Sequence, residues 1–245
     1  MSADILELLN DDSNYYGPMG KAFLSNSDIG TLLSNPQHYG KSRPDNKSFA
    51  EGRYFHQLLT EPDKAEVAHF VDASTRTTNL YKEYCKEHKL DFALLKSEVD
   101  SVEKWASTMK SNIDFYDAVY REGNRYEVPA IKTIHGRDWK GKADIVCDDM
   151  LIDLKTTSDI SQFKWSAKKY NYDSQAFIYQ ELFGKPLVFY VIDKVSGVLG
   201  VFTPSAEFIE GGERKVIRAV EVFNRFFAPD APEDISNYYI DEVLF

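Results

Sequence analysis

Residues 141–157 read Gly-Lys-Ala-Asp-Ile-Val-Cys-Asp-Asp-Met-Leu-Ile-Asp-Leu-Lys-Thr-Thr. Two short apolar runs are joined by an acidic turn, which predicts a β-hairpin with strands at 143–147 and 151–154. Each run carries one acidic residue among apolar neighbours, Asp144 in the first and Asp153 in the second, and Lys155 follows the second run. A buried carboxylate is costly unless it is paired or holds a metal. Two carboxylates and an ammonium group on one hairpin therefore indicate a functional site.

Metal-assisted hydrolysis of a phosphodiester is the chemistry that needs these groups. Magnesium and similar hard cations take oxygen ligands, so two carboxylates and a backbone carbonyl make a suitable protein contribution. Strand alternation places Asp153 and Lys155 on one face, while the Leu154 side chain points into the core. We therefore expect the Leu154 carbonyl to be a third ligand. Lys155 could orient or deprotonate the attacking water and offset negative charge at phosphorus.

The ordered pattern Gly-Lys-Ala-Asp144 followed by Asp153-Leu-Lys155-Thr-Thr resembles the PD-(D/E)xK nuclease superfamily. The resemblance is to the branch that holds exonuclease VIII (RecE), the lambda-type phage exonucleases and the RecB nuclease domain. Asp-x-Lys alone is common by chance, so the specificity of the resemblance depends on further segments in the same order. It implies an α/β fold, with a central mixed β-sheet, helices on both sides and a restriction-endonuclease-like core.

One such segment lies upstream, where Ser48-Phe-Ala-Glu51 predicts a capping box for a helix bounded by Pro62. Gly52 and His56 are four residues apart and share one face of that helix. A lone histidine there is more often an ordinary core or surface residue. The segment nevertheless resembles the Gly-x-x-x-His-x-Leu-Leu-x-Glu-Pro pattern of the nuclease branch, which implies that His56 contacts the metal.

A glutamate also precedes the hairpin, on a strand predicted over 125–134 that ends in a turn at His135-Gly136. Relatives carry a glutamate at the start of this strand, and Glu127 matches it. From the residues alone two roles stay open for Glu127. It is either a third acid near the metal, or an ion-pair partner of Arg125 or Lys142.

Downstream of Lys155, residues 156–159 offer N-caps for a helix over about 160–169, and the next helix starts near Asp173. Gln175 and Tyr179 lie one turn apart on that helix and would be ordinary helix residues if taken alone. The Gln-x-x-x-Tyr motif at this distance marks the RecB-like branch. The resemblance implies that it braces the lysine and contacts nucleic acid.

The length of 245 residues suits one nuclease domain. We expect four parts within it: an N-terminal arm, a mainly helical part with His56, the catalytic core, and a covering helix with an acidic tail, over residues 1–24, 25–120, 125–205 and 205–245. The arm and the tail are expected to pack on the body, or else to contact a partner or another subunit.

The formal net charge of −10 argues against a nucleic-acid enzyme, but contacts with phosphates need only a local excess of basic residues. Two such clusters flank the expected site elements. The residues expected to bind DNA are Lys41, Arg43, Arg53, Lys164, Lys168 and Lys169.

The resemblance implies one or two magnesium or manganese ions, held by His56, Asp144, Asp153 and the Leu154 carbonyl. Some relatives carry an iron–sulfur cluster, which two cysteines in a whole chain cannot build, so none is expected here. No apolar run suggests a membrane helix and no signal peptide is evident, so we expect a soluble, cytoplasmic protein.

The expected substrate is the end of double-stranded DNA, and the expected role is phage recombination or DNA processing. Relatives form rings and act with a single-strand annealing protein, so a homo-oligomeric ring and such a partner are implied as well. The alternatives are a RecB-like single-strand or host-DNA-degrading nuclease and a non-catalytic DNA-end-binding member of the fold.

Overall fold

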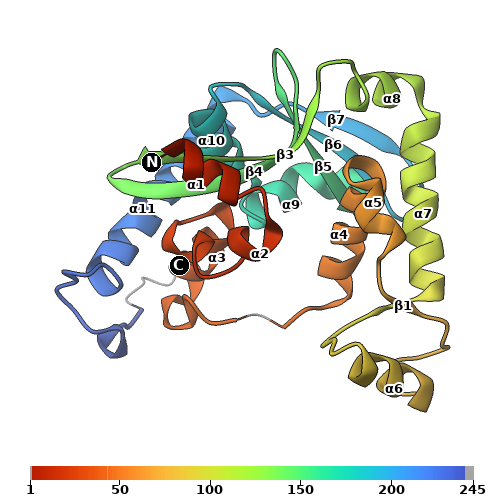
Figure 1. Cartoon of the computed structure of the whole chain (residues 1–245). Helices are drawn as coiled ribbons and strands as arrows, with labels where there is room; N and C mark the ends of the chain where they lie inside the picture. Colours follow the sequence, from red (N-terminus) through yellow and green to blue (C-terminus); the bar gives the residue numbers. More distant parts are fainter. Residues whose placement is uncertain (1, 43, 241–245) are drawn as a thin grey trace.

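The computed structural model describes residues 2–42 and 44–240, which fold around one five-stranded mixed sheet flanked by helices (Figure 1). The strands stand in chain order across the sheet, namely β3 (Arg125–Ile134), β4 (Arg137–Val146), β5 (Leu151–Thr157), β6 (Leu187–Asp193) and β7 (Leu199–Phe202). All neighbours are antiparallel except β5 and β6, which are parallel and therefore need a helical crossover. The expected mixed sheet with flanking helices is confirmed.

The long β3–β4 hairpin is the frame on which the site is built. His135 and Gly136 both have positive φ, 48° and 77°, which suits a tight two-residue turn between twisted strands. The predicted strand over 125–134 agrees with β3. The second hairpin, between β4 and β5, is shorter, because its recorded pairing is limited to Ile145 with Ile152 and Val146 with Leu151. β4 leaves β5 at that point and continues along β3.

Helices cover both faces of the sheet. One face is packed by α10 (Tyr172–Phe183) and α3 (Asn26–Ser34), and the other by α4 (Lys47–Thr60), α7 (Lys96–Ser111) and α8 (Ile113–Val119). Alternation along β5 divides its side chains between the two cores: Leu151 belongs to the α10 side, and Ile152 and Leu154 to the α4 side. The side chains of Asp153 and Lys155 consequently share the α10 side of the strand.

The long helix α11 (Ala206–Phe226) has Ser205 as its N-cap and agrees with the expected helix after residue 205, but it packs on α10 and α3 and covers the sheet only through them. Gly212 allows this close packing, since a Cβ atom there would lie 2.0 Å from the Asp173 carbonyl oxygen of α10. The described part of the tail folds back through the η4 turn (Ile235–Asn237), with an ion pair of 2.8 Å between Arg225 and Glu233.

The N-terminal arm packs on the body, as the first of its two expected roles requires. Its helices α1 (Ser2–Leu8) and α2 (Asp12–Tyr15) and the turn η1 (Gly20–Ala22) lead to Leu24, which exchanges backbone hydrogen bonds with β4 at Asp138 and Lys140. Within the ranges 2–42 and 44–240, none of the helices combines the length and the apolar character needed to cross a membrane.

A small satellite core lies beyond α4 and the short α5 (Pro62–Glu66). It contains the two-residue strands β1 (Phe70–Val71) and β2 (Leu94–Leu95) and the helix α6 (Asn79–Glu87). The predicted capping box of α4 is wrong: Asn46 is the N-cap and accepts a hydrogen bond from Phe49 N–H, so the helix starts earlier than expected. Glu51, assigned to that cap, is instead buried beside Lys47 and Lys194.

Candidate active site

Three acidic residues form one row across the sheet. In β3 and β4 the pairs on either side of Glu127, Tyr126 with Ile145 and Val128 with Ala143, place Glu127 opposite Asp144. Continuing the β4–β5 register by one step places Asp144 opposite Asp153, where the recorded ladder has ended. Residues opposite each other on neighbouring strands have their Cβ atoms about 5 Å apart. The sheet therefore concentrates three carboxylates at the place where β4 separates from β5.

Asp144 is the best-satisfied acid of the row. One oxygen accepts a hydrogen bond of 2.7 Å from Leu154 N–H, which replaces a ladder hydrogen bond at the separation point, and the other lies 3.4 Å from His56 Nδ1. Burial alone would raise the pKa of Asp144, but His56, Lys155 and the Leu154 N–H together hold it below the usual value. Asp144 is therefore a carboxylate at neutral pH.

The His56 side chain extends to this row from α4, which packs on the face of the sheet opposite α10. Its Nε2–H donates to the Leu154 carbonyl oxygen at 2.9 Å, while Nδ1 faces Asp144. Burial would lower the pKa of His56, but the Asp144 carboxylate outweighs it and raises the pKa to about 9. The structure thus brings together two predicted metal ligands, His56 and Asp144, with the predicted Leu154 carbonyl.

Glu127 lies in the row as an acid near the other ligands. Thr60 Oγ1 donates to its Oε1 at 3.2 Å, and its backbone has a positive φ of 50°. Burial, then the charge of Asp144, raise the pKa of Glu127 to about 8, against the opposing effect of His56. Lys142, one expected partner, is instead paired with Asp12 at 2.6 Å. The geometry favours the first of the two expected roles, a third acid at the site.

These groups fit a hard divalent cation. His56, Glu127 and Asp144 each present a ligand atom, and the three atoms lie within 4.8 Å of one another. His56 Nε2–H donates to the Leu154 oxygen, so that nitrogen would release its proton before the two atoms could share a cation. Beside them, Asp153 Oδ2 is fully buried and makes no hydrogen bond. With the Lys155 ammonium 2.5 Å away, this oxygen still has a lone pair that a cation could accept.

Asp153 and Lys155 form the other side of the site. Lys155 Nζ lies 2.5 Å from Asp153 Oδ2, which makes a close ion pair. Burial raises the pKa of Asp153 to about 6, although Lys155 acts in the opposite direction. Burial alone would lower the pKa of Lys155, but Asp153 outweighs it and raises that pKa above its ordinary value. Lys155 is therefore an ammonium group, with its charge 4.9 Å from the centre of the Tyr172 ring.

The Gln-x-x-x-Tyr pair of α10 faces the sheet as expected, but it does not touch the lysine. Gln175 Nε2 donates to Asp153 Oδ1 at 2.5 Å, and the Tyr179 hydroxyl donates to the Lys142 carbonyl at 2.9 Å. Both side chains are buried. The glutamine thus braces the carboxylate that pairs with Lys155, and the tyrosine fixes β4 just before Asp144.

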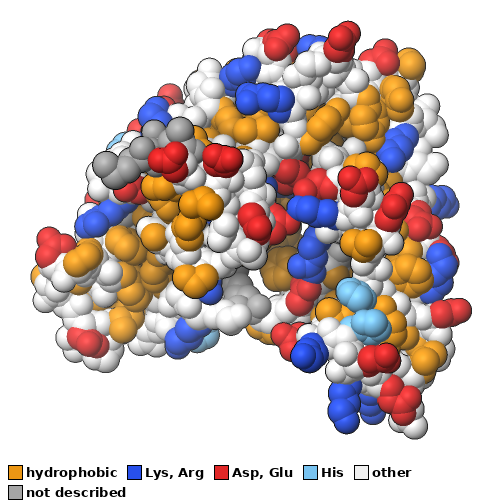
Figure 2. Space-filling view, viewed as in Figure 1, with side chains coloured by type: hydrophobic (Ala, Val, Ile, Leu, Met, Phe, Trp, Pro, Cys, Tyr) orange, Lys and Arg blue, Asp and Glu red, His pale blue; other side chains and the backbone are white. Residues whose placement is uncertain are grey.

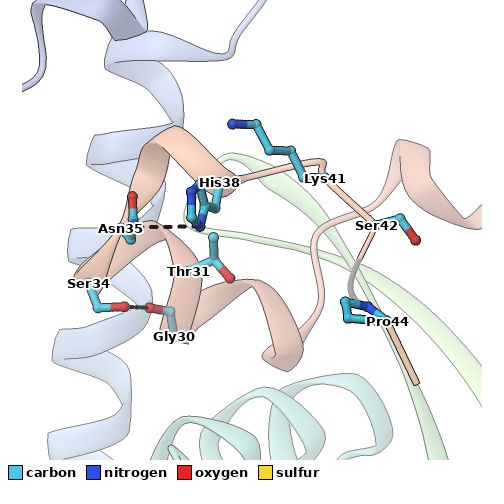
Figure 3. Close-up of a pocket in the computed structure, with 8 residues that line it drawn as sticks. All are labelled: Gly30, Thr31, Ser34, Asn35, His38, Lys41, Ser42 and Pro44. Atoms are coloured by element: carbon cyan, nitrogen blue, oxygen red, sulfur yellow. Dashed lines mark hydrogen bonds between the residues drawn. The ribbon is translucent and has the colours of Figure 1, made fainter. Parts of the chain in front are cut away.

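The predicted DNA-binding residues lie around the site rather than in it. Lys41, Arg53 and the three lysines of α9 (Phe163–Lys169) are exposed, and Arg53 forms an ion pair with Asp45; Arg43 lies outside the described residues. Figure 2 shows the molecule hollowed between the part around α2 and α3 and the part around α4 and α5, with acidic and basic side chains at the rim. Lys41 also borders a separate open pocket beside α3, lined by His38, Asn35 and Thr31 among others (Figure 3). That pocket contains none of the acidic row.

One feature of the site has no signal in the sequence. The arm places Asp12 between two lysines, 2.6 Å from Lys142 and 2.5 Å from Lys64, and the Tyr15 ring lies against Lys142 as well. Lys142 could be noticed from its position two residues before Asp144 on the same strand. Its partner Asp12 lies 130 residues away and could not.

Comparison with known proteins adds a family and a fold. A family model described as a PDDEXK-like domain of unknown function (DUF3799) matches residues 31–194, the part of the chain that runs from α3 through the acidic row to the end of β6. Among curated proteins, none matches the chain in sequence.

Two crystal structures match this one in a structural comparison, and only the first has a TM-score above 0.5. The first, from Eubacterium rectale and named "Putative exonuclease", has 16% sequence identity, covers 96% of each chain and has a TM-score of 0.63. The second, of SSO0001, has 13% identity, covers 81% of this chain and 85% of the other, and has a TM-score of 0.33. The first structure confirms the α/β fold with a restriction-endonuclease-like core that was expected from the sequence.

Proposed function

Because the chain belongs to the PDDEXK-like family DUF3799, we propose that it is a divalent-metal-dependent deoxyribonuclease. The expected membership in the PD-(D/E)xK superfamily is confirmed by that family and by the fold. The observation that carries the proposal is the row Glu127–Asp144–Asp153, which meets His56 on one side and Lys155 on the other. A buried group of this composition is suited to hydrolysis of a phosphodiester bond.

We assign the roles of the residues as follows. His56, Glu127, Asp144 and the Leu154 carbonyl would hold magnesium or manganese, with Asp153 completing the ligands. The bound cation would polarise the phosphate and lower the pKa of water. Lys155 is held as an ammonium group by Asp153, so we assign it the orientation of the water and the stabilisation of negative charge at phosphorus. Gln175 positions Asp153, and Tyr179 positions β4.

We further propose an exonuclease that acts on ends of double-stranded DNA in phage recombination or DNA processing. The sequence resemblance to phage exonucleases supports this reading, as does the name of the Eubacterium rectale neighbour. A homo-oligomeric ring, an annealing-protein partner and a cytoplasmic location belong to the same proposal. The alternative is a RecB-like nuclease that degrades single strands or host DNA. A non-catalytic DNA-end-binding member is disfavoured because both acids and the lysine of the motif are in place.

The test compares linear duplex DNA with covalently closed circles of the same sequence, in Mg²⁺ or Mn²⁺ and again with excess chelator. We expect end-dependent loss of the linear substrate, intact circles, and no hydrolysis with chelator. Asp144→Asn should lower the rate at least about 1,000-fold, because it removes a ligand charge from the site. The matched control is Asp148→Asn, at an exposed aspartate of the adjacent turn, which should hydrolyse DNA at the wild-type rate.

Different results point to different corrections. Cleavage of closed circles would replace the exonuclease with an endonuclease, and faster digestion of single strands would favour the RecB-like alternative. Hydrolysis that continues in Asp144→Asn at the wild-type rate would contradict the assigned site. A monomeric mass in solution at micromolar concentration, with and without DNA, would contradict the ring.

A further inference from the structure

We propose that α9 and the residue that follows it form a base-stacking platform for unpaired nucleotides next to the reacting phosphodiester. The platform consists of the aromatic side chains Trp165 and Tyr170 with the lysines Lys164, Lys168 and Lys169. The inference rests on the proposed nuclease function and adds a substrate feature to it, namely that the strand in the site is locally single-stranded.

The two aromatic side chains of the platform are exposed. Trp165 is 62% exposed and Tyr170 is 58% exposed, whereas the other two tryptophans, Trp105 and Trp139, are 8% and 0% exposed. A large ring left in water has a cost that burial against another surface would remove. The two exposed rings therefore indicate a surface that binds something flat and apolar.

The charge around these rings selects an anionic occupant. Residues 160–172 contain three lysines and no acidic residue, in a chain whose formal net charge is −10. Lys164 Nζ lies 4.5 Å from the centre of the Trp165 ring, and Lys169 Nζ lies 5.8 Å from that of Tyr170. A flat π-system attached to a chain of negative charges is the chemistry of a nucleic acid, which binds to aromatic rings through its bases and to lysines through its phosphates.

A chain of ring contacts connects the platform with the catalytic lysine. The centres of Tyr170 and Tyr172 are 6.1 Å apart, and Tyr172 lies 4.9 Å from Lys155 Nζ. Phe163, the buried first residue of α9, also packs on Tyr172 at 5.9 Å. Tyr172 is thus in contact with both Lys155 and Tyr170, so a strand whose phosphate reacts beside Lys155 would place a neighbouring base near Tyr170. Trp165 precedes Tyr170 by five residues and would meet a base further along the strand.

The platform is held rigidly, which lowers the entropy cost of binding. Lys215 of α11 donates to the Lys168 carbonyl at 2.8 Å, to Asn171 Oδ1 at 2.9 Å and to Asp173 Oδ1 at 2.8 Å. Asn171 adopts the left-handed conformation, with φ of 59°, that turns the chain from α9 into α10. The end of α9 is therefore fixed to the helix that carries Gln175.

The occupant must have unpaired bases. In a duplex the faces of the internal bases are stacked on one another, so the open faces belong to the outer side of a terminal pair, to a frayed end or to a single strand, and only the last two offer successive bases to both Trp165 and Tyr170. The lysines alone would bind a duplex through its phosphates, with no use for the rings. Single-stranded DNA is therefore the proposed ligand, and a duplex end becomes one after local melting.

The experiment uses intrinsic fluorescence, because Trp165 is the one exposed tryptophan among the three of the chain. The full chain carrying Asp153→Asn is titrated in chelator with oligo-dT, with an abasic oligonucleotide of equal length, and with blunt duplex DNA. We expect oligo-dT to quench the emission of Trp165. The abasic strand should quench it weakly at equal bound fraction, since it has the phosphates without the bases, and the blunt duplex should quench least.

Variants measured by anisotropy of labelled oligo-dT separate stacking from charge. Trp165→Ala and Tyr170→Ala should each weaken binding about 5- to 150-fold, the range for one stacked base, whereas Trp165→Phe should keep most of the affinity. Lys169→Ala should weaken oligo-dT and abasic binding equally and reduce the salt dependence. The matched control is Tyr116→Ala, at an exposed ring of α8 (47% exposed), which should bind as the parent does.

Equal quenching by abasic and normal strands, or unchanged affinity in both alanine variants, would overturn the platform. So would a Trp165→Ala variant that loses self-association and no DNA affinity, since the ring would then be a contact between copies. The outcome is separable from that of the proposed function. Hydrolysis without quenching would remove the platform alone, and base-dependent quenching in a chain that never hydrolyses DNA would remove the nuclease alone.

Discussion

Each side of the candidate site contains a buried aspartate, and different residues surround it on the two sides. On one side Asp144 is buried beside His56 of α4 and Glu127 of β3. On the other, Asp153 is buried beside Lys155 of its own strand and Gln175 of α10. The pKa of Asp144 is lowered, whereas that of Asp153 is raised to about 6.

The difference lies in the charges and donors around each buried carboxylate. Burial of Asp144 is opposed by His56, Lys155 and the Leu154 N–H, whereas at Asp153 burial and the charge of Asp144 outweigh Lys155, although Gln175 donates to that carboxylate. Opposite charges and hydrogen-bond donors stabilise the charged form of a carboxylate, and burial and like charges destabilise it. We infer that the Asp144 side is the preformed half of a cation site, and that the Asp153 side is the half that changes its contacts most when a cation binds.

The largest predicted effect separates the two sides by function. Lys155→Ala should lower the hydrolysis rate at least about 1,000-fold and leave Mn²⁺ affinity within about threefold, because Lys155 stabilises charge in the reaction and is not a ligand. Asp153→Asn should lower both. Rates on linear duplex DNA and calorimetric titration with Mn²⁺ measure the two quantities, and Lys132→Ala, at an exposed lysine paired with Glu181, serves as the control.

Equal loss of metal affinity in Lys155→Ala and Asp153→Asn would remove the distinction between the two sides. In that case Lys155 would be needed to assemble the cation site itself. Retained hydrolysis in Lys155→Ala would contradict its catalytic role altogether.

A second, smaller effect concerns protons released by metal binding. His56 with a pKa of about 9, Glu127 with about 8 and Asp153 with about 6 hold protons that a cation must displace. Mn²⁺ affinity should therefore rise between pH 6 and 9, by up to about tenfold per pH unit for each proton displaced. Titration at pH 7 in two buffers of different ionisation enthalpy counts the protons. Glu127→Gln should release about one fewer than the parent, and an unchanged count would place the cation away from Glu127.

The same comparison shows how much of the site the sequence could predict. Asp153, Leu154 and Lys155 are adjacent in the chain, and strand alternation alone places the acid and the lysine on one face. His56 precedes Asp144 by almost 90 residues, so no local pattern joins them. Only the family resemblance predicted that His56 and Asp144 lie close together. The position of α4 against β5 is set by packing of the whole core.

Other errors have the same physical origin. The N-cap of α4 fell to Asn46 because several residues near 46–48 could accept that hydrogen bond, and local sequence does not rank them. Gln175 donates a hydrogen bond to Asp153 rather than bracing Lys155 as expected, because of how α10 packs against β5. The strand β3 and the cap Ser205 of α11 were predictable because alternation and capping are local.

The third prediction concerns stability and tests Glu127 in the metal-free protein. Its pKa is about 8 in the folded chain against 4.5 as its ordinary value, so the native state holds the proton between these values while the unfolded chain releases it. Stability should therefore fall as pH rises from about 4.5 to 8, and Glu127→Gln should remove that loss. We expect the variant to match the parent near pH 4.5 and to exceed it by on the order of 5 kcal/mol at pH 9.

Denaturant unfolding in chelator at both pH values measures this difference. Glu122→Gln, at an exposed glutamate before β3, is the control and should match the parent at both. A Glu127→Gln variant that is less stable than the parent at pH 9 would mean that this carboxylate is stabilised in its charged form. The negative charges of the acidic row would then be compensated by the neighbouring residues. The two sides of the site would differ only in the position of Lys155.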